Sequence, residues 1–212
     1  YPAGSDEAVV EELDDLRAAR KKAAPVFFDA PVKETPEGIS AADRKRGYAL
    51  FSRDDGRKVL PSSAPRAGET MTEWSGFGAP GQYVSFMVGL HPLRDVGEVK
   101  ALLSGLTGPG GRTIPVENGK NVGVVRYLER ALSKTEYRYT VVPGPIQPRD
   151  PMPVGTVTTS WVVRIRVPED AAPGVYTGRV SVTAANAPPA ALQLRLFMLP
   201  VKLATPPCER FM

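Results

Sequence analysis

The stretch that decides the fold is residues 161–178, which read WVVRIRVPEDAAPGVYTG. Apolar residues stand at every second position from Trp161, and Arg164 and Arg166 occupy positions between them. Successive side chains of a strand point to opposite faces of a sheet, so this period of two predicts a strand with one buried face. Pro173-Gly174 predicts a turn, because Pro fixes φ and Gly accepts positive φ. The stretch therefore predicts a strand, a turn and a return strand.

The same period of two recurs on both sides of this stretch. Clear runs lie at 83–90, 176–183 and 192–198, and weaker candidates lie at 48–53, 69–75, 98–103, 121–128 and 136–142. Five prolines within 143–153 predict an extended connection from one sheet edge to the other, since each proline removes a ladder donor. About eight or nine short strands without helices between them predict an all-β fold. We expect a two-sheet antiparallel sandwich of the immunoglobulin-like or jelly-roll kind.

Composition agrees with this class. The chain has 212 residues with 22 Pro and 20 Gly, too many for a protein of long helices. The glycines show no three-residue period, which excludes a collagen-like fibre. Because 42% of the residues are hydrophobic, a sizeable core is possible. A chain of this length predicts one domain, or one domain with appendages.

The N-terminal part differs from the rest. Residues 5–24 contain no Gly or Pro and carry apolar residues at helical spacing, so they predict one amphipathic helix. We expect residues 1–47 to be this helix and a Pro-rich linker, 48–203 to be the sandwich, and 204–212 to begin a linker to a further C-terminal domain.

Residues with catalytic potential are few. His91 and Cys208 are single copies, so neither has a partner at metal-ligand or triad spacing. Asp54-Asp55 and Glu169-Asp170 are adjacent acids in predicted turns, where Asp is favoured for turn hydrogen bonds. The glycine-rich Gly108–Gly111 lacks the Lys-Ser/Thr of a phosphate loop. The sequence therefore predicts no catalytic residues, no metal and no cofactor.

Other partner classes are also disfavoured. The net charge is +4, and the basic runs at 20–22 and 44–46 lack interleaved aromatics. A nucleic-acid footprint needs basic residues gathered on one face, so we expect no nucleic-acid partner. No run of about 18 apolar residues is present, so we expect no membrane span.

Aromatic residues offer the one candidate binding surface. Trp74 and Phe77 flank Gly76 near a predicted strand end, and Tyr83 follows in the next strand. Exposed rings on a sandwich can stack on sugar rings, so Trp74 and Phe77 are candidate ligand-binding residues. The alternative is core packing, the common place of large aromatics.

Several segments together resemble a known domain. They are 47–53 (GYALFSR), 79–86 (APGQYVSF), 93–99 (LRDVGEV), 114–118 (IPVEN), 125–127 (VRY), 161–178 and Leu199-Pro200. In this order they resemble the N-terminal β-sandwich of secreted glycoside-hydrolase-like proteins of the β-N-acetylgalactosaminidase type. Family members often have Glu where this chain has Gln82, so no role is transferred to that position.

The resemblance implies a function for the chain. In that family the sandwich precedes a catalytic (β/α) barrel, which carries the acidic catalytic pair and lies beyond Met212 if it is present. We therefore expect a non-catalytic module of a secreted or periplasmic carbohydrate-processing protein, whose partner is the catalytic barrel of the same polypeptide. Two alternatives stay open. The chain is a carbohydrate-binding module that uses exposed aromatics, or an assembly domain that recruits a partner through its N-terminal helix.

Overall fold

The computed structural model describes residue 15 and residues 27–29, 31–53, 58–116, 121–133, 138–147 and 152–201. The expected helix at 5–24 therefore lies outside the described residues apart from Asp15, and so do Asp54, Asp55 and Cys208. The elements are β1 (Phe27–Asp29), α2 (Ala41–Arg46), β2 (Tyr48–Phe51), β3 (Glu73–Gly78), β4 (Tyr83–Pro92), β5 (Glu98–Leu103), β6 (Leu106–Thr107), the 3-10 turn η1 (Pro109–Gly111), β7 (Thr113–Ile114), β8 (Val122–Ser133), β9 (Arg138–Gln147), β10 (Met152–Pro153), β11 (Thr159–Arg166), β12 (Gly174–Ala184) and β13 (Ala187–Met198).

The chain divides into two compact units. The larger unit holds residues 33–126 and 143–212, and the smaller holds 1–32 and 127–142. Within the smaller unit, β1 pairs in parallel with β9, and Thr140 Oγ1 donates to the Asp29 carbonyl at 3.0 Å.

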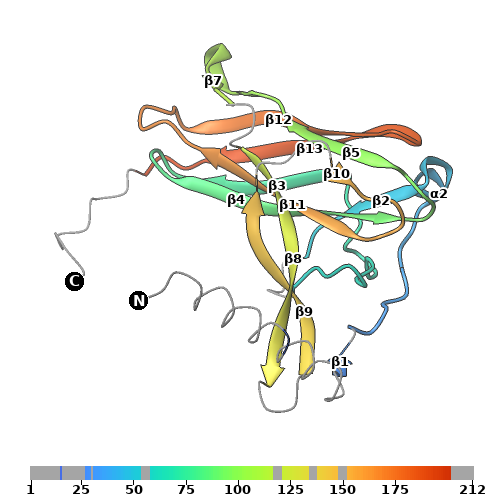
Figure 1. Ribbon diagram of the computed structural model, residues 1–212. Coiled ribbons are helices and arrows are strands. Elements are labelled where there is room, and N and C mark those ends of the chain that lie inside the picture. The colour runs from blue at the N-terminus through green and yellow to red at the C-terminus, as the bar shows by residue number, and fades with distance from the viewer. Residues whose placement is uncertain are drawn as a thin grey trace, which may run out of the picture. The chain divides into compact units, whose positions relative to one another are not determined.

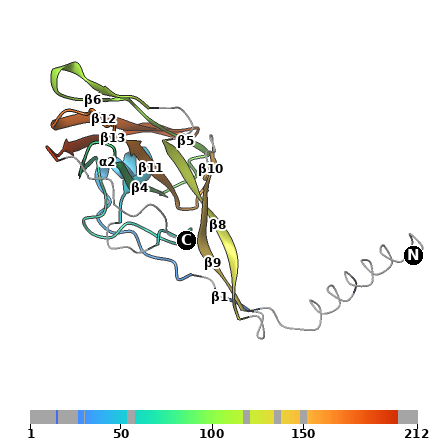
Figure 2. The same cartoon turned by 90° about the vertical axis from the view of Figure 1, so that its left-hand side faces the viewer.

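The larger unit is a two-sheet sandwich (Figures 1 and 2). One sheet, which we call sheet A, has the strand order β9-β8-β11-β4-β2, and the parts of β8 and β9 that belong to the larger unit are 122–126 and 143–147. The other has the order β10-β5-β12-β13-β3, with β6 and β7 attached to β12, and we call it sheet B. Figure 1 shows the two sheets edge-on, one above the other, with β12 and β13 facing β4 and β11. The predicted all-β sandwich is confirmed.

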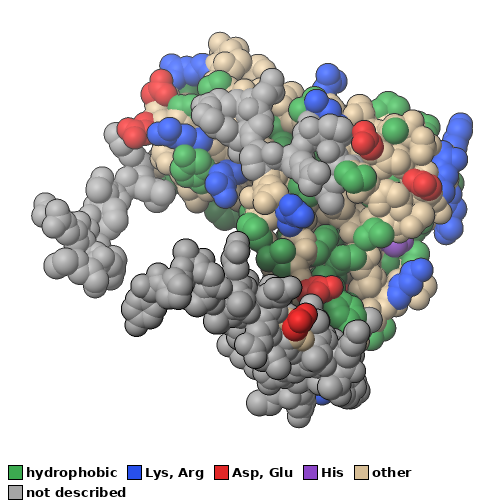
Figure 3. Space-filling view, viewed as in Figure 1, with side chains coloured by type: hydrophobic (Ala, Val, Ile, Leu, Met, Phe, Trp, Pro, Cys, Tyr) green, Lys and Arg blue, Asp and Glu red, His purple; other side chains and the backbone are tan. Residues whose placement is uncertain are grey.

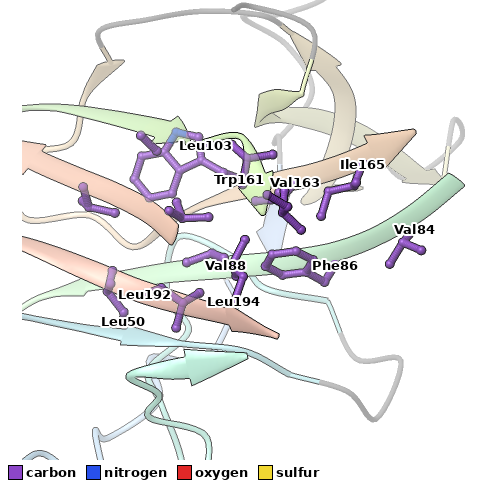
Figure 4. Packing of buried hydrophobic residues seen from close by; sticks show 14 of the residues in the cluster. Leu50, Val84, Phe86, Val88, Leu103, Trp161, Val163, Ile165, Leu192 and Leu194 are labelled. Atoms are coloured by element: carbon purple, nitrogen blue, oxygen red, sulfur yellow. The ribbon is translucent and has the colours of Figure 1, made fainter. Parts of the chain in front are cut away.

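One row of each principal strand fills the space between the sheets. Figure 4 shows apolar side chains of β4 and β11 meeting those of β13 and β5 in one layer. Trp161 heads the inward row of β11 and is only 2% exposed, as the alternation predicted. The inward residues are, in β4, Val84, Phe86, Val88 and Leu90; in β11, Trp161, Val163 and Ile165; in β5, Val99, Ala101 and Leu103; and in β13, Leu192, Leu194, Leu196 and Met198.

The stretch 161–178 joins the two sheets. β11 lies antiparallel to β4 in sheet A, with Arg166 opposite Tyr83, and β12 lies antiparallel to β13 in sheet B, with Gly174 opposite Met198. The turn between them is a crossing from one layer to the other, as expected for a sandwich, and not a hairpin within one sheet. Gly174 has φ +132°, a conformation that side-chain-bearing residues rarely adopt.

The structure adds details that periodicity does not carry. Most strand pairs are antiparallel as predicted, but β3 pairs with β13 in parallel. β3 begins at Glu73, four residues after the expected start at 69. β9 continues through Pro143 and Pro145 to Gln147, after which the chain crosses to β10 at the edge of sheet B. These prolines are tolerated because this end of β9 is an edge with one pairing neighbour.

The segment before β2 is not a plain linker. Residues 41–46 form α2, which begins at Ser40 with a capping box: the Ser40 hydroxyl accepts from the Asp43 amide, and the Asp43 carboxylate accepts from the Ser40 amide. Gly47 ends it in the left-handed conformation at φ +95°. The basic run at 44–46 lies in the last turn, where positive charge suits the helix dipole.

Candidate functional site

The two aromatics singled out in the sequence lie on opposite faces of β3. The strand alternates, so Trp74 faces the interior and Phe77 faces outward. Trp74 packs against the core, with its ring stacked on that of Phe86 at a centroid distance of 4.0 Å. Phe77 is 70% exposed. The two rings therefore do not form one platform, and Phe77 alone is available to a partner.

Phe77 belongs to an apolar row across the outer face of sheet B. The register places Phe197 of β13 directly between Val175 of β12 and Phe77 of β3. All three are exposed, Phe197 by 42%. Side chains directly opposite on neighbouring strands lie about 4.5–5.5 Å apart at Cβ, so the three side chains form one continuous strip. We call it the Phe77–Phe197 strip.

Charged residues lie beside this strip on the same face. The Arg195 guanidinium lies 5.7 Å from the centroid of the Phe197 ring, within cation–π range. Arg195 Nη1 lies 3.8 Å from Glu73 Oε1, with both side chains about half exposed. An ion pair so exposed adds little stability. The strip is thus an apolar surface with a polar border.

Sequence reasoning singled out Phe77 but not Phe197. The alternation of β13 could have identified Phe197 as an outward residue, because it lies between the inward residues Leu196 and Met198. What the sequence lacks is the register that places Phe197 beside Phe77, since β3 and β13 are more than a hundred residues apart in the chain.

No catalytic arrangement forms among the described acids and His91. Glu169 and Asp170 are both exposed in the turn after β11. His91 Nδ1 lies 2.8 Å from Thr158 Oγ1 and 3.2 Å from the Ser63 carbonyl oxygen. Burial lowers the pKa of His91, and the positive charge of Lys33 lowers it further against the opposing hydrogen bond to Ser63. No group of three or more potential metal ligands occurs within the described ranges.

A buried charged cluster ties the segment before α2 to the loop before β3. The Arg53 side chain is 1% exposed; its Nε lies 2.9 Å from Glu69 Oε1 and its Nη2 lies 2.9 Å from Glu34 Oε2. It also donates to the Ala64 carbonyl at 2.8 Å. Burial acts to raise the pKa of Glu34, but the hydrogen bonds from Arg53, the Ala64 amide and Arg66 lower it overall. Every charge is paired, so this cluster is structural.

Gln82 and the glycine-rich segment, which the sequence analysis also considered, lie in turns. Gln82 Oε1 accepts from the Ala79 amide at 3.0 Å and so closes the turn before β4. Pro109–Gly111 forms the short turn η1. On the face drawn in Figure 3, Lys and Arg side chains are scattered among acids and apolar residues. No helix in the described part of the chain is long and apolar enough to cross a membrane.

Comparison with protein-family models gives no match, and neither does comparison with curated proteins. Among solved structures, the chain is similar to a family 123 glycoside hydrolase from Clostridium perfringens, described in a study of glycolipid glycan hydrolysis. The TM-score is 0.57 at 15% sequence identity, over 76% of this chain and 28% of that chain. At this identity the likeness shows the sandwich fold alone, and the chain spans under a third of the hydrolase.

Two further solved structures match at lower scores. The PapD-like domain 7 of human CEP192 has a TM-score of 0.34 at 11% identity, over 81% of this chain and 98% of that chain. The seventh ScaB type I cohesin from Pseudobacteroides cellulosolvens has a TM-score of 0.22 at 10% identity, over 66% of this chain and 94% of that chain.

Proposed function

We propose that the chain is a non-catalytic β-sandwich module of a secreted carbohydrate-processing protein, and that it supports a catalytic barrel in the same polypeptide. The observation that carries the proposal is the fold similarity to a glycoside hydrolase of which this chain matches 28%. The sequence motifs of the hydrolase-associated sandwich point the same way. A module that covers so small a share of the hydrolase has the size of an accessory domain.

The Phe77–Phe197 strip is the surface that we assign to the barrel. After β13 the Leu199 amide donates to the Gly78 carbonyl at 2.9 Å, which holds the chain beside the end of β3. The last described residues, Leu199 to Val201, therefore leave sheet B at the end of β3, close to the strip. Tethering raises the effective concentration of a following domain at a nearby surface, so a modest apolar strip is sufficient for docking.

The first experiment concerns activity. The purified 212-residue chain is incubated with a panel of aryl glycosides, and the full natural polypeptide is assayed in parallel. We expect turnover by the full polypeptide and none by the 212-residue chain. Turnover by the 212-residue chain that disappears in Glu169→Gln/Asp170→Asn would overturn the non-catalytic role. A full polypeptide without any barrel would overturn the supporting role.

The second experiment concerns the strip. In the full polypeptide, Phe77→Ser and Phe197→Ser are expected to shorten the half-life of glycosidase activity on heating, because the barrel loses its apolar contact. Phe28→Ser is the matched control, since Phe28 is also an exposed phenyl group but lies in the smaller unit. Equal half-lives for all three variants and the parent would count against docking at the strip. Binding of neutral glycans that is lost in Phe77→Ser would assign the strip to sugar instead.

A further inference from the structure

A pocket of about 760 Å³ lies on the outer face of sheet A, on the opposite side of the sandwich from the Phe77–Phe197 strip. β11 runs through it and contributes Val162, Arg164 and Arg166, while Tyr83 of β4 stands beside them. Ligand-binding pockets in proteins commonly measure about 300–1,000 Å³. The pocket is therefore large enough for a ligand of a few sugar units.

One end of the pocket is cationic. Arg164 and Arg166 lie two residues apart on the same face of a central strand, which places their Cα atoms about 7 Å apart. Their partners in β4 are Ser85 and Tyr83, neither of which is a carboxylate. Within the described residues, neither guanidinium has an ion-pair partner. Two unpaired positive charges of this spacing favour an anion with more than one acceptor.

The other end of the pocket is apolar. Gly123 of β8 leaves a gap in the sheet face, and a Cβ at that position would lie 2.3 Å from Ile146 Cγ2. The Ile146 side chain thus lies against Gly123 and forms, with Val162, an apolar floor. Tyr83, opposite Arg166 at the cationic end, adds a ring that is 58% exposed. An aromatic ring with a polar tip gives both a stacking face and a hydrogen-bonding group.

We propose that this pocket binds an oligosaccharide that carries carboxylate or sulfate groups. The guanidiniums of Arg164 and Arg166 pair with the anionic groups, the C–H face of one pyranose ring packs on Tyr83, and a second ring packs on the apolar floor. Glu169 at the rim accepts hydrogen bonds from sugar hydroxyls. A pocket with an exposed aromatic ring beside two neighbouring arginines fits a charged sugar better than an acidic peptide, because binding an acidic peptide does not require an aromatic ring for stacking. This site is separate from the proposed support of a barrel, so each proposal can fail without the other.

The test is calorimetric titration of the 212-residue chain with three tetrasaccharides of equal length. One is a galacturonate tetrasaccharide, one is a sulfated dextran tetrasaccharide and one is the neutral maltotetraose. We expect at least one charged probe to bind, the neutral probe to bind at least about tenfold more weakly, and added salt to weaken the charged interaction. The stronger of the two charged probes identifies carboxylate or sulfate as the natural group.

Variants connect binding to the pocket. Arg164→Ala and Arg166→Ala are each expected to weaken the charged probe by about tenfold or more while the melting temperature stays within a degree or two, because both side chains are exposed. Arg179→Ala is the matched control, since Arg179 is an exposed arginine on sheet B. The proposal is overturned if no charged probe binds, if maltotetraose binds equally well, or if Arg179→Ala weakens binding as much as the pocket variants.

Discussion

Trp74 and Phe86 hold the two sheets together through a ring stack. Trp74 comes from β3 of sheet B and Phe86 from β4 of sheet A, and their rings lie 4.0 Å apart at 13° from parallel. Gly76 makes this possible, because a Cβ there would lie 2.4 Å from Trp74 Cη2. The indole therefore lies along its own strand over a glycine and reaches across the sandwich. An aromatic that the sequence offered as a ligand contact is a contact between the layers.

Because of this stack, we expect substitution of Trp74 to destabilise the protein more than substitution of Phe77, the other aromatic residue of β3. Trp74→Ala is expected to lower the free energy of unfolding by about 2–3 kcal/mol, somewhat less than for a fully buried Trp because the ring is partly exposed. Gly76→Ala is expected to cost about 1–2 kcal/mol through displacement of the ring. Phe77→Ala, on the exposed face, should change stability by no more than about 0.5 kcal/mol. Urea unfolding of the three variants measures this, and a Phe77 effect as large as that of Trp74 would contradict the assignment of faces.

The faces of β3 show where sequence reasoning reaches its limit. Period two located β4, β11, β12 and β13 because a continuous, mainly apolar row alternates with a second row that contains polar residues. β3 reads EWSGFG, with an aromatic on each face and glycines at inward positions, so alternation alone does not say which face is buried. Its parallel pairing with β13, which fixes the faces, depends on long-range contacts that no local pattern encodes.

The candidate sites illustrate the same limit. Alternation marked Arg164 and Arg166 as outward residues of β11, but their neighbours Ser85 and Tyr83 follow from strand register. The apolar floor beside them depends on Gly123 of β8, against which Ile146 of β9 packs. The position of Phe197 beside Phe77 likewise follows from the register between β13 and β3. The sequence therefore predicted the outward residues of β11 but not those of β3, and the strand register determines which outward residues are neighbours.

The Arg53 cluster predicts a strong and specific loss on substitution. Arg53→Met removes a guanidinium that is bound by Glu34, Glu69 and the Ala64 carbonyl. Among the described residues, Glu34 then keeps only Arg66 as a cationic partner, and Glu69 loses the buried guanidinium. We expect about 3 kcal/mol of destabilisation. Arg53→Lys should recover only part of it, because an ammonium cannot make the two parallel bonds to Glu69.

Chemical denaturation of both Arg53 variants measures the effect. Arg66→Met is the comparison, since Arg66 contacts the same Glu34 but its side chain is 39% exposed. Its cost should be no more than about 1 kcal/mol. If Arg53→Met and Arg66→Met lower the free energy of unfolding equally, burial does not make the Arg53 ion pairs more important for stability than the exposed pair of Arg66.

His91 predicts a pH dependence of stability near neutrality. Because the pKa of His91 in the folded protein lies below its ordinary value of 6.5, the unfolded chain takes up this proton first as the pH falls. Stability is therefore full above about pH 6.5 and falls as the pH drops from there through the folded-state pKa. The Glu34 pKa is lowered from 4.5, so its contribution is lost only at more acidic pH.

The chain has a single histidine, which makes this test clean. The free energy of unfolding is measured at pH 7.5 and pH 5.5 for the parent and for His91→Gln. The parent should lose more stability than the variant over this interval, and NMR titration should place the imidazole pKa below 6.5. An equal loss in both proteins would contradict a lowered pKa of His91 in the folded protein.

Gly174 gives the last prediction, and it concerns the turn that joins the two sheets. Its φ of +132° is a conformation open to glycine, and a Cβ there would lie 2.5 Å from Pro109 Cγ in η1. Gly174→Ala therefore combines backbone strain with a clash, and we expect a cost of about 2–4 kcal/mol. Gly110→Ala is the control, because Gly110 has φ +64° and nothing lies within 4 Å of its Cβ position. It should cost only about 1 kcal/mol, the strain of the left-handed region alone. Thermal unfolding of the two variants separates the terms, and equal melting temperatures would mean that η1 yields to the new methyl group, so that Pro109 does not fix the position of the turn.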